Sequence, residues 1–233
     1  MHRRTVLSSA LVAWVGGTSL SLLTYRAHAA AFSQADASGA VRAALERGAK
    51  VAVGQLGRAD GFLSNDKIRI PLPDVLDKVA PLLRTLGRGR QLDELVTSMN
   101  HAAENAVSLA LPLLNNAIKS MSVQDAQQIL TGGEHSVTDF FSARTREPLS
   151  TQFMPVVSKA MEKFSLAQRY NELTSRAAGL GLIKGPQAVT IQQHVTGRAL
   201  DGLYFVIGEE ERRIRNDPVG TGSALLKKVF SAL

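Results

Sequence analysis

The 233-residue chain contains no cysteine. It therefore has no disulfide framework, no thiolate ligand for a metal, no cysteine nucleophile and no cysteine for lipid attachment. Stability must come from a packed core instead, and about 200 residues are enough for one domain with such a core. The lack of free thiols also suits an oxidising compartment.

Aromatic residues are scarce as well, at 5% of the chain, and the only tryptophan is Trp14. Single-stranded nucleic acid binds to clustered, exposed aromatic rings. The sequence shows no such cluster, so we expect no nucleic-acid partner. It also lacks the Gly-x-Ser-x-Gly elbow, the Walker loop, the His-Glu-x-x-His motif and the EF-hand spacing. We therefore expect no catalytic residue, no metal and no cofactor.

The clearest feature that is present is an export signal over residues 1–29. Arg3 and Arg4 form its positive start, an apolar stretch follows, and Ala27 and Ala29 are the small side chains that a signal peptidase reads. The start, Arg-Arg-Thr-Val-Leu, resembles the twin-arginine signal of bacteria and predicts a periplasmic protein. The alternatives are an ordinary secretory signal with two arginines and an uncleaved membrane anchor.

Cleavage of this signal changes the charge of the chain. The formal net charge is +7, from 27 basic and 20 acidic residues, and the signal carries three arginines and no acid. The remainder has 24 bases against 20 acids, a net charge of +4. This mildly basic balance permits weak attraction to anionic lipid but does not argue for it. No stretch after the signal is apolar enough to predict an integral membrane span.

The remaining chain has helical periodicity almost throughout. After a flexible start at 30–37, we expect one all-α domain over residues 38–232, with about 7–9 helices. The longest apolar stripe predicts a helix over 92–121, which Pro112 should kink or split. Further helices are expected over residues 40–56, 75–86 and 225–230, and the stretch 151–176 is expected to be helical with breaks that the pattern does not locate.

Three helix starts carry capping boxes, in which a hydroxyl and a later acid or amide satisfy free backbone N–H groups reciprocally. The last of these boxes opens a helix that should reach about Arg215, with one apolar stripe along it. The pairs are Ser122 with Asp125, Ser136 with Asp139, and Thr190 with Gln193.

The segment between the first two predicted helices is the most unusual part of the chain. Asp60 and the next glycine form a turn pair, yet Phe62 and a leucine follow directly. These apolar side chains should insert into the core or into a partner, and Asn65 can cap or bind. The alternative is a loop pinned by its own side chains. Residues 68–73 alternate like an extended strand that proline confines to a sheet edge.

Two polar rows on predicted helices are candidates for chemistry. His101 and Glu104 share a helix face that a metal could use, although one such pair is half a site at best. His194, Arg198 and Asp201 form a similar row, and an acid–base role for it would need an enclosing cleft. The alternatives are a solvated face for the first row and intrahelical hydrogen bonds for the second. The candidate ligand or partner surface consists of Asp60, Phe62, Asn65, Asp201 and Tyr204.

A charged run, Glu-Glu-Glu-Arg-Arg-Ile-Arg, occupies residues 209–215. Helical spacing pairs Glu209 with Arg212 or the next arginine, and Glu211 with Arg215. Such pairs contribute roughly 0.2–0.5 kcal/mol each. We expect a solvated helix face here, and a partner-docking patch is the alternative.

Several stretches together resemble a known family, and they are Gln55–Asn65, Ile70–Pro73, Ser98–Glu104, Ala199–Tyr204 and Leu225–Phe230. In this order they are similar to the exported bacterial family of domains of unknown function DUF4197, over roughly residues 38–230. The resemblance implies an all-helical exported domain with no assigned activity. His101 departs from the arginine expected at its position, and because arginine does not ligate metal, this weakens the metal hypothesis.

We therefore expect an exported, periplasmic helical protein that binds a protein or small-molecule partner and catalyses nothing. One alternative is an enzyme or cofactor carrier, because twin-arginine signals are often used by proteins that acquire a cofactor before export. Its candidate residues would be Glu104, His194 and Asp201. The other alternative is a peripheral membrane protein that uses its positive charge and an amphipathic helix.

Overall fold

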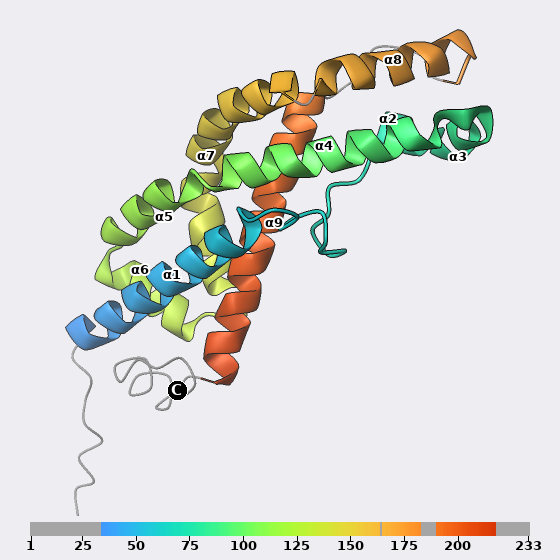
Figure 1. The fold of residues 1–233 in the computed structure, drawn as a ribbon. Coiled ribbons are helices and arrows are strands. Elements are labelled where there is room, and N and C mark those ends of the chain that lie inside the picture. Colours follow the sequence, from blue (N-terminus) through green and yellow to red (C-terminus); the bar gives the residue numbers. More distant parts are fainter. Residues whose placement is uncertain (1–33, 164, 183–189, 218–233) are drawn as a thin grey trace, which may run out of the picture. The chain divides into compact units, whose positions relative to one another are not determined.

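The computed structural model describes residues 34–163, 165–182 and 190–217 (Figure 1). All of these residues belong to one unit, which spans residues 32–233. The predicted export signal and the predicted helix at 225–230 lie outside the described residues. The first helix begins at Gln34, within the stretch expected to be a flexible start.

Every regular element in the described ranges is helical, which confirms the expected all-α class. Within these ranges the stretch 68–73 forms no strand. No described helix is both long enough and apolar enough to cross a membrane. The elements are α1 Gln34–Leu56, α2 Asp74–Asp77, α3 Ala80–Leu83, the π-helical turn η1 Arg84–Arg88, α4 Gly89–Val107, α5 Ala110–Lys119, α6 Val123–Thr131, α7 Ser136–Lys163, α8 Leu166–Gly179 and α9 Ile191–Asn216.

Pro112 splits the long helix predicted over 92–121. Proline has no N–H for the carbonyl of Ser108, and its ring crowds that carbonyl. The regular helix is interrupted at Ser108 and the residue after it, so α4 ends and α5 begins there. The prediction of one helix over 75–86 is wrong, because Pro81 acts in the same way on the carbonyl of Asp77, the last residue of α2. Gly87, which directly follows the stretch 75–86, has a left-handed φ of 76° and kinks the chain just before α4.

Two of the three predicted capping boxes are present. The Ser122 hydroxyl accepts the backbone N–H of Asp125 at 3.1 Å, and the Thr190 hydroxyl accepts that of Gln193 at 3.2 Å. In both boxes the second side chain returns a bond to the backbone N–H of the first residue. These local signals position the starts of α6 and α9.

The third predicted box, at Ser136, is wrong. Helix α7 begins at Ser136 itself, and the Glu211 carboxylate of α9 accepts the N–H groups of Val137 and Thr138 at 3.2 and 3.3 Å. Glu211 is only 4% exposed and also pairs with Arg215 at 2.9 Å. The charged run on α9 is therefore not wholly the solvated face that we expected, because one of its acids caps a second helix from a buried position.

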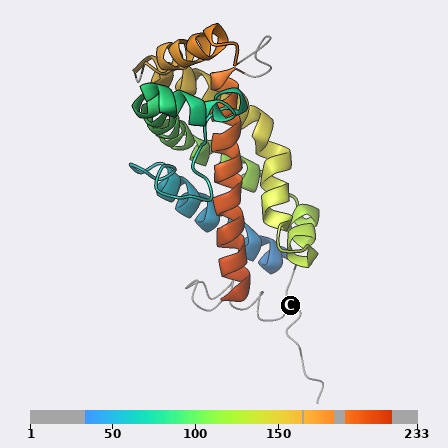
Figure 2. The same cartoon turned by 90° about the vertical axis from the view of Figure 1, so that its right-hand side faces the viewer.

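Helix α9 packs against α7, α1 and α4 (Figures 1 and 2). Full burial of one aliphatic or phenylalanine side chain contributes about 1.5–3 kcal/mol. The continuous stripe along α9 therefore holds it firmly among the other helices. Every residue of the stripe predicted for this helix is buried, namely Ile191, Val195, Ala199, Leu203, Ile207 and Ile214.

Candidate functional site

The loop between α1 and α2, residues 57–73, is held against α9 by Phe62. Its ring is fully buried, and a Cβ atom added to Gly202 of α9 would lie 2.6 Å from the Cε1 atom of Phe62. Phe62 therefore inserts into the core, which was one of its two expected roles. Its side chain is not part of an exposed surface.

Asn100 on α4 holds the later part of the same loop. This fully buried side chain accepts the N–H of Ile70 at 2.9 Å and donates to the carbonyl of the same residue at 3.1 Å. One amide group thus satisfies both backbone groups that a neighbouring strand would otherwise satisfy. His194 on α9 lies 3.0 Å from the carbonyl oxygen of Pro71. The stretch expected as an edge strand is therefore paired with side chains of two helices.

Glu104 anchors the start of the loop to α4. Glu104 is 6% exposed, and its carboxylate accepts the backbone N–H of Phe62 at 3.2 Å. Burial raises the pKa of Glu104, whereas the backbone N–H of Phe62 and the charge of a protonated His101 lower it. The buried carboxylate thus serves first as a backbone acceptor for the loop.

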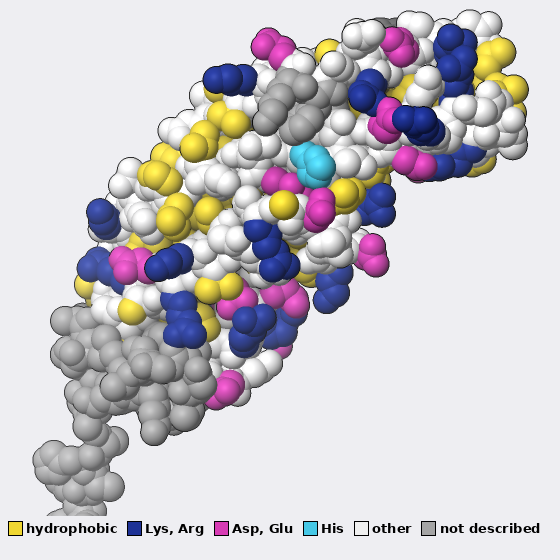
Figure 3. Space-filling model, in the orientation of Figure 1, with side chains coloured by type: hydrophobic (Ala, Val, Ile, Leu, Met, Phe, Trp, Pro, Cys, Tyr) yellow, Lys and Arg dark blue, Asp and Glu magenta, His cyan; other side chains and the backbone are white. Residues whose placement is uncertain are grey.

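Asp60 lies in the turn just before Phe62, next to the bond between Phe62 and Glu104. Its φ is 56°, a left-handed conformation that aspartate tolerates better than most residues. Its carboxylate lies 3.1 Å from Nε2 of His101, and the ligand atoms of Asp60, His101 and Glu104 all lie within 4.8 Å of one another. On the face drawn in Figure 3, a histidine side chain lies beside acidic side chains. The helical spacing in the sequence placed His101 and Glu104 on one helix face, but it did not predict Asp60 as their neighbour.

Asn65, the third loop candidate, forms a local turn. Its side-chain oxygen accepts the N–H of Lys67 at 3.1 Å, and its backbone carbonyl accepts those of Ile68 and Arg69. Of its two expected roles, the structure places it in the capping one.

The remaining two candidates, Asp201 and Tyr204, meet at Arg146 of α7. The guanidinium donates to the Asp201 carboxylate at 2.5 Å and stacks over the Tyr204 ring, 5.3 Å from its centroid. The Tyr204 hydroxyl lies 2.9 Å from that of Thr145, and burial raises the pKa of Tyr204. Asp201 thus bonds to α7, and His194 of the same predicted row bonds to the loop. The predicted surface therefore divides into two groups. Asp60, Phe62 and Asn65 belong to the loop after α1, whereas Asp201 and Tyr204 contact Arg146 of α7.

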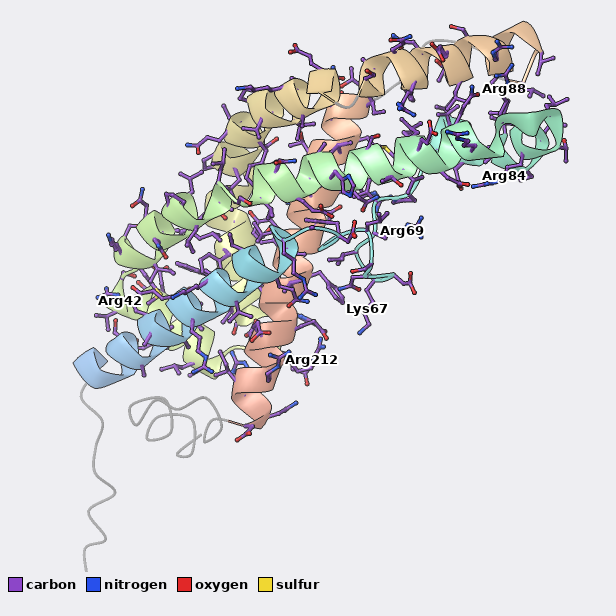
Figure 4. The ribbon with its side chains drawn as sticks, viewed as in Figure 1. Arg42, Lys67, Arg69, Arg84, Arg88 and Arg212 are labelled. Carbon is purple, nitrogen blue, oxygen red and sulfur yellow. The ribbon has the colours of Figure 1, made fainter. Side chains whose placement is uncertain are left out.

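A groove of about 600 Å³ opens on the outer face of α4, beside α8. Arg84, labelled in Figure 4, pairs with Asp93 at 2.5 Å. Arg90 pairs with Glu94 at 2.9 Å, and Arg169 of α8 pairs with the same carboxylate. The arginine hydrogen bonds hold the pKa values of both carboxyl groups below their usual range. The groove is lined by Arg84, Gly89, Arg90, Asp93, Glu94, Thr97, Ser98, His101 and Arg169.

This groove was not predicted from the sequence. Its arginines come from three separate elements, and no local motif joins them. His101 is the link to the predicted candidates, because it lines the groove and also contacts Asp60.

The fold and site together define an all-helical domain with a pinned loop beside a charged groove. The chain belongs to a family described as proteins of unknown function, DUF4197, whose model matches residues 31–231. This match confirms the family that the sequence motifs resemble. No curated protein and no solved structure matches the chain at a significant level.

Proposed function

We propose that this is an exported, periplasmic, non-catalytic binding protein that takes up a small carboxylate- or phosphate-bearing ligand in the groove beside α4. The observation that supports this function is the convergence of three arginines from three elements on one groove, Arg84 from η1, Arg90 from α4 and Arg169 from α8. The export part of the proposal is supported by the signal-like residues 1–29.

The charges of the groove favour an anionic ligand. Three guanidinium groups face only two carboxylates, those of Asp93 and Glu94. A guanidinium presents a planar set of donors that matches a carboxylate or phosphate in a bidentate manner. Partly exposed ion pairs such as these contribute only about 0–1 kcal/mol each. An incoming anion can therefore displace a resident carboxylate at little cost.

The hydroxyl groups of the groove are arranged for packing. Thr97 donates to the carbonyl of Asp93 at 2.9 Å, and Ser98 donates to that of Glu94 at 2.8 Å. A hydroxyl nucleophile needs a general base in hydrogen-bond reach. Both hydroxyl groups instead donate their hydrogen bonds to backbone carbonyl oxygens one turn earlier in α4. This arrangement supports binding rather than catalysis.

Calorimetric titration of inorganic phosphate and of succinate into the protein tests the groove. We expect saturable binding that Arg169→Gln weakens by about tenfold or more, because one charge-assisted hydrogen bond contributes about 1.5–3 kcal/mol. Arg144→Gln is the matched control, because Arg144 pairs with Asp125 at 2.7 Å and does not line the groove. Equal affinity in the parent and Arg169→Gln, or no saturable binding by the parent, would contradict the groove as the binding site.

Cell fractionation tests the export part separately. We expect the full-length chain in the periplasm and the variant Arg3→Lys with Arg4→Lys in the cytoplasm, because the twin-arginine translocase reads the arginine pair. Unchanged export of the double variant would favour an ordinary secretory signal instead.

A further inference from the structure

We propose that Asp60, His101 and Glu104 bind one divalent first-row transition-metal ion, for which Zn²⁺ is the probe. Each residue offers one ligand atom, and these atoms lie within 4.8 Å of one another. This site is distinct from the proposed anion groove, because its ligand is a cation and its three residues include only one that lines the groove.

The fold holds the three side chains together before any ion arrives. His101 and Glu104 are three residues apart on α4, so they lie on one face of the helix. Asp60 is presented by a tight turn in which a Cβ atom at Gly61 would lie 2.5 Å from the carbonyl oxygen of Gln55. Only glycine fits at that position, so the turn that carries Asp60 is specified by its sequence and anchored to α4.

The ligand set suits a transition metal. Imidazole is a preferred ligand of zinc, iron, nickel and copper, and carboxylates complete many such sites. Two carboxylates and one neutral imidazole offset the charge of a divalent ion. Three protein ligands also leave a coordination position open, as in sites that bind an exogenous ligand.

Burial supplies an energetic reason for a cation at this place. Glu104 is 6% exposed, and taking a carboxylate out of water is costly unless an opposite charge compensates. A carboxylate offers about four lone-pair positions. Glu104 can therefore keep its bond to the N–H of Phe62 and still ligate a metal.

Calorimetric titration of ZnCl₂ into the untagged, chelator-treated protein, with no phosphate present, tests the site. We expect one equivalent of Zn²⁺ to bind and far weaker binding of Mg²⁺, which disfavours imidazole ligands. His101→Arg should lower Zn²⁺ affinity by at least about 100-fold, because loss of even an outer-shell partner costs about 10–100-fold. Asp60→Asn, which tolerates the same left-handed backbone, should lower the affinity by at least about tenfold.

Two controls separate metal ligation from folding and from nonspecific binding. Arginine at position 101 can pair with Asp60 but cannot ligate a metal, so His101→Arg should retain the circular dichroism spectrum and melting temperature of the parent. His135→Arg removes an exposed histidine outside the cluster and should leave Zn²⁺ affinity unchanged. Absence of a stoichiometric Zn²⁺ site in the parent would overturn the proposal, as would parent-like affinity in His101→Arg. Neither result bears on phosphate or succinate binding, so the two proposals fail independently.

Discussion

Replacement of Gly202 by alanine tests the contact that anchors the loop in the core. Gly202 lies inside α9, where alanine is normally preferred over glycine by about 1 kcal/mol. Here, however, the added Cβ atom would lie 2.6 Å from Cε1 and 3.3 Å from Cζ of Phe62. Overpacking of a filled core costs about 1–3 kcal/mol. We therefore expect Gly202→Ala to be neutral or to destabilise the protein by up to about 2 kcal/mol.

Two companion variants isolate this clash. Gly197 lies on the same helix, and a Cβ atom there would meet nothing within 4 Å. Gly197→Ala should therefore gain the full propensity term of about 1 kcal/mol. Phe62→Leu removes the two ring atoms closest to position 202. In that background, Gly202→Ala should change sign and stabilise the protein by up to about 1 kcal/mol.

Urea denaturation followed by circular dichroism provides the free energies of unfolding for this double-mutant cycle. If Phe62 packs against Gly202, the coupling energy between the two substitutions should be favourable by at least about 1 kcal/mol. If Gly202→Ala stabilises the parent protein as much as Gly197→Ala does, Phe62 does not pack against α9 as described.

Three further predictions concern the buried polar groups. Asn100→Ala should lower the free energy of unfolding by roughly 2–4 kcal/mol, because it leaves both backbone groups of Ile70 buried without a partner; a loss under about 1 kcal/mol would argue against that contact. Glu211→Ala should cost about 3–5 kcal/mol in the same assay, whereas Glu209→Ala, at a more exposed pair, should cost about 0–1 kcal/mol. Burial holds the pKa of His194 below its ordinary value. The stability from its neutral ring is therefore complete above about pH 6.5 and is lost as the pH falls through that value toward the folded-state pKa. His194→Gln should make the unfolding free energy fall less between about pH 8 and pH 5, and an unchanged slope would contradict this assignment.

Local signals predicted much of the fold correctly. The stripe on α9, the break at Pro112 and two of the three capping boxes depend on local residue patterns. The break at Pro81 was not predicted. The box at Ser136 failed because the N–H groups of Ser136 and Asp139 bond to the backbone carbonyls of Gly133 and His135. Glu211, about 75 residues away in sequence, accepts the next two N–H groups instead, those of Val137 and Thr138. The strand predicted over 68–73 failed because alternation reveals which side chains are buried but not what pairs with the backbone.

The candidate site was predictable only in fragments. His101 and Glu104 could be placed on one helix face because their spacing is helical, and Asp60 stood out as a turn residue. Nothing in the sequence joined these observations. The bond between Phe62 and Glu104 that brings the loop to α4 spans 42 positions. The arginine groove was not predicted because its three arginines come from three separate elements, which only the fold brings together.

The sequence by itself determined the helical class, most of the helix ends and the family, because periodicity, caps and prolines act over a few residues. Only the tertiary structure decided what the unusual loop does. It buried Phe62 against Gly202 and brought Asp60 to His101 and Glu104. The physical reason is that helix periodicity specifies which face of each helix is buried but not which other elements that face meets. The packing of α9 against its neighbours makes that choice, and with it the positions of the charged groups that the two binding proposals use.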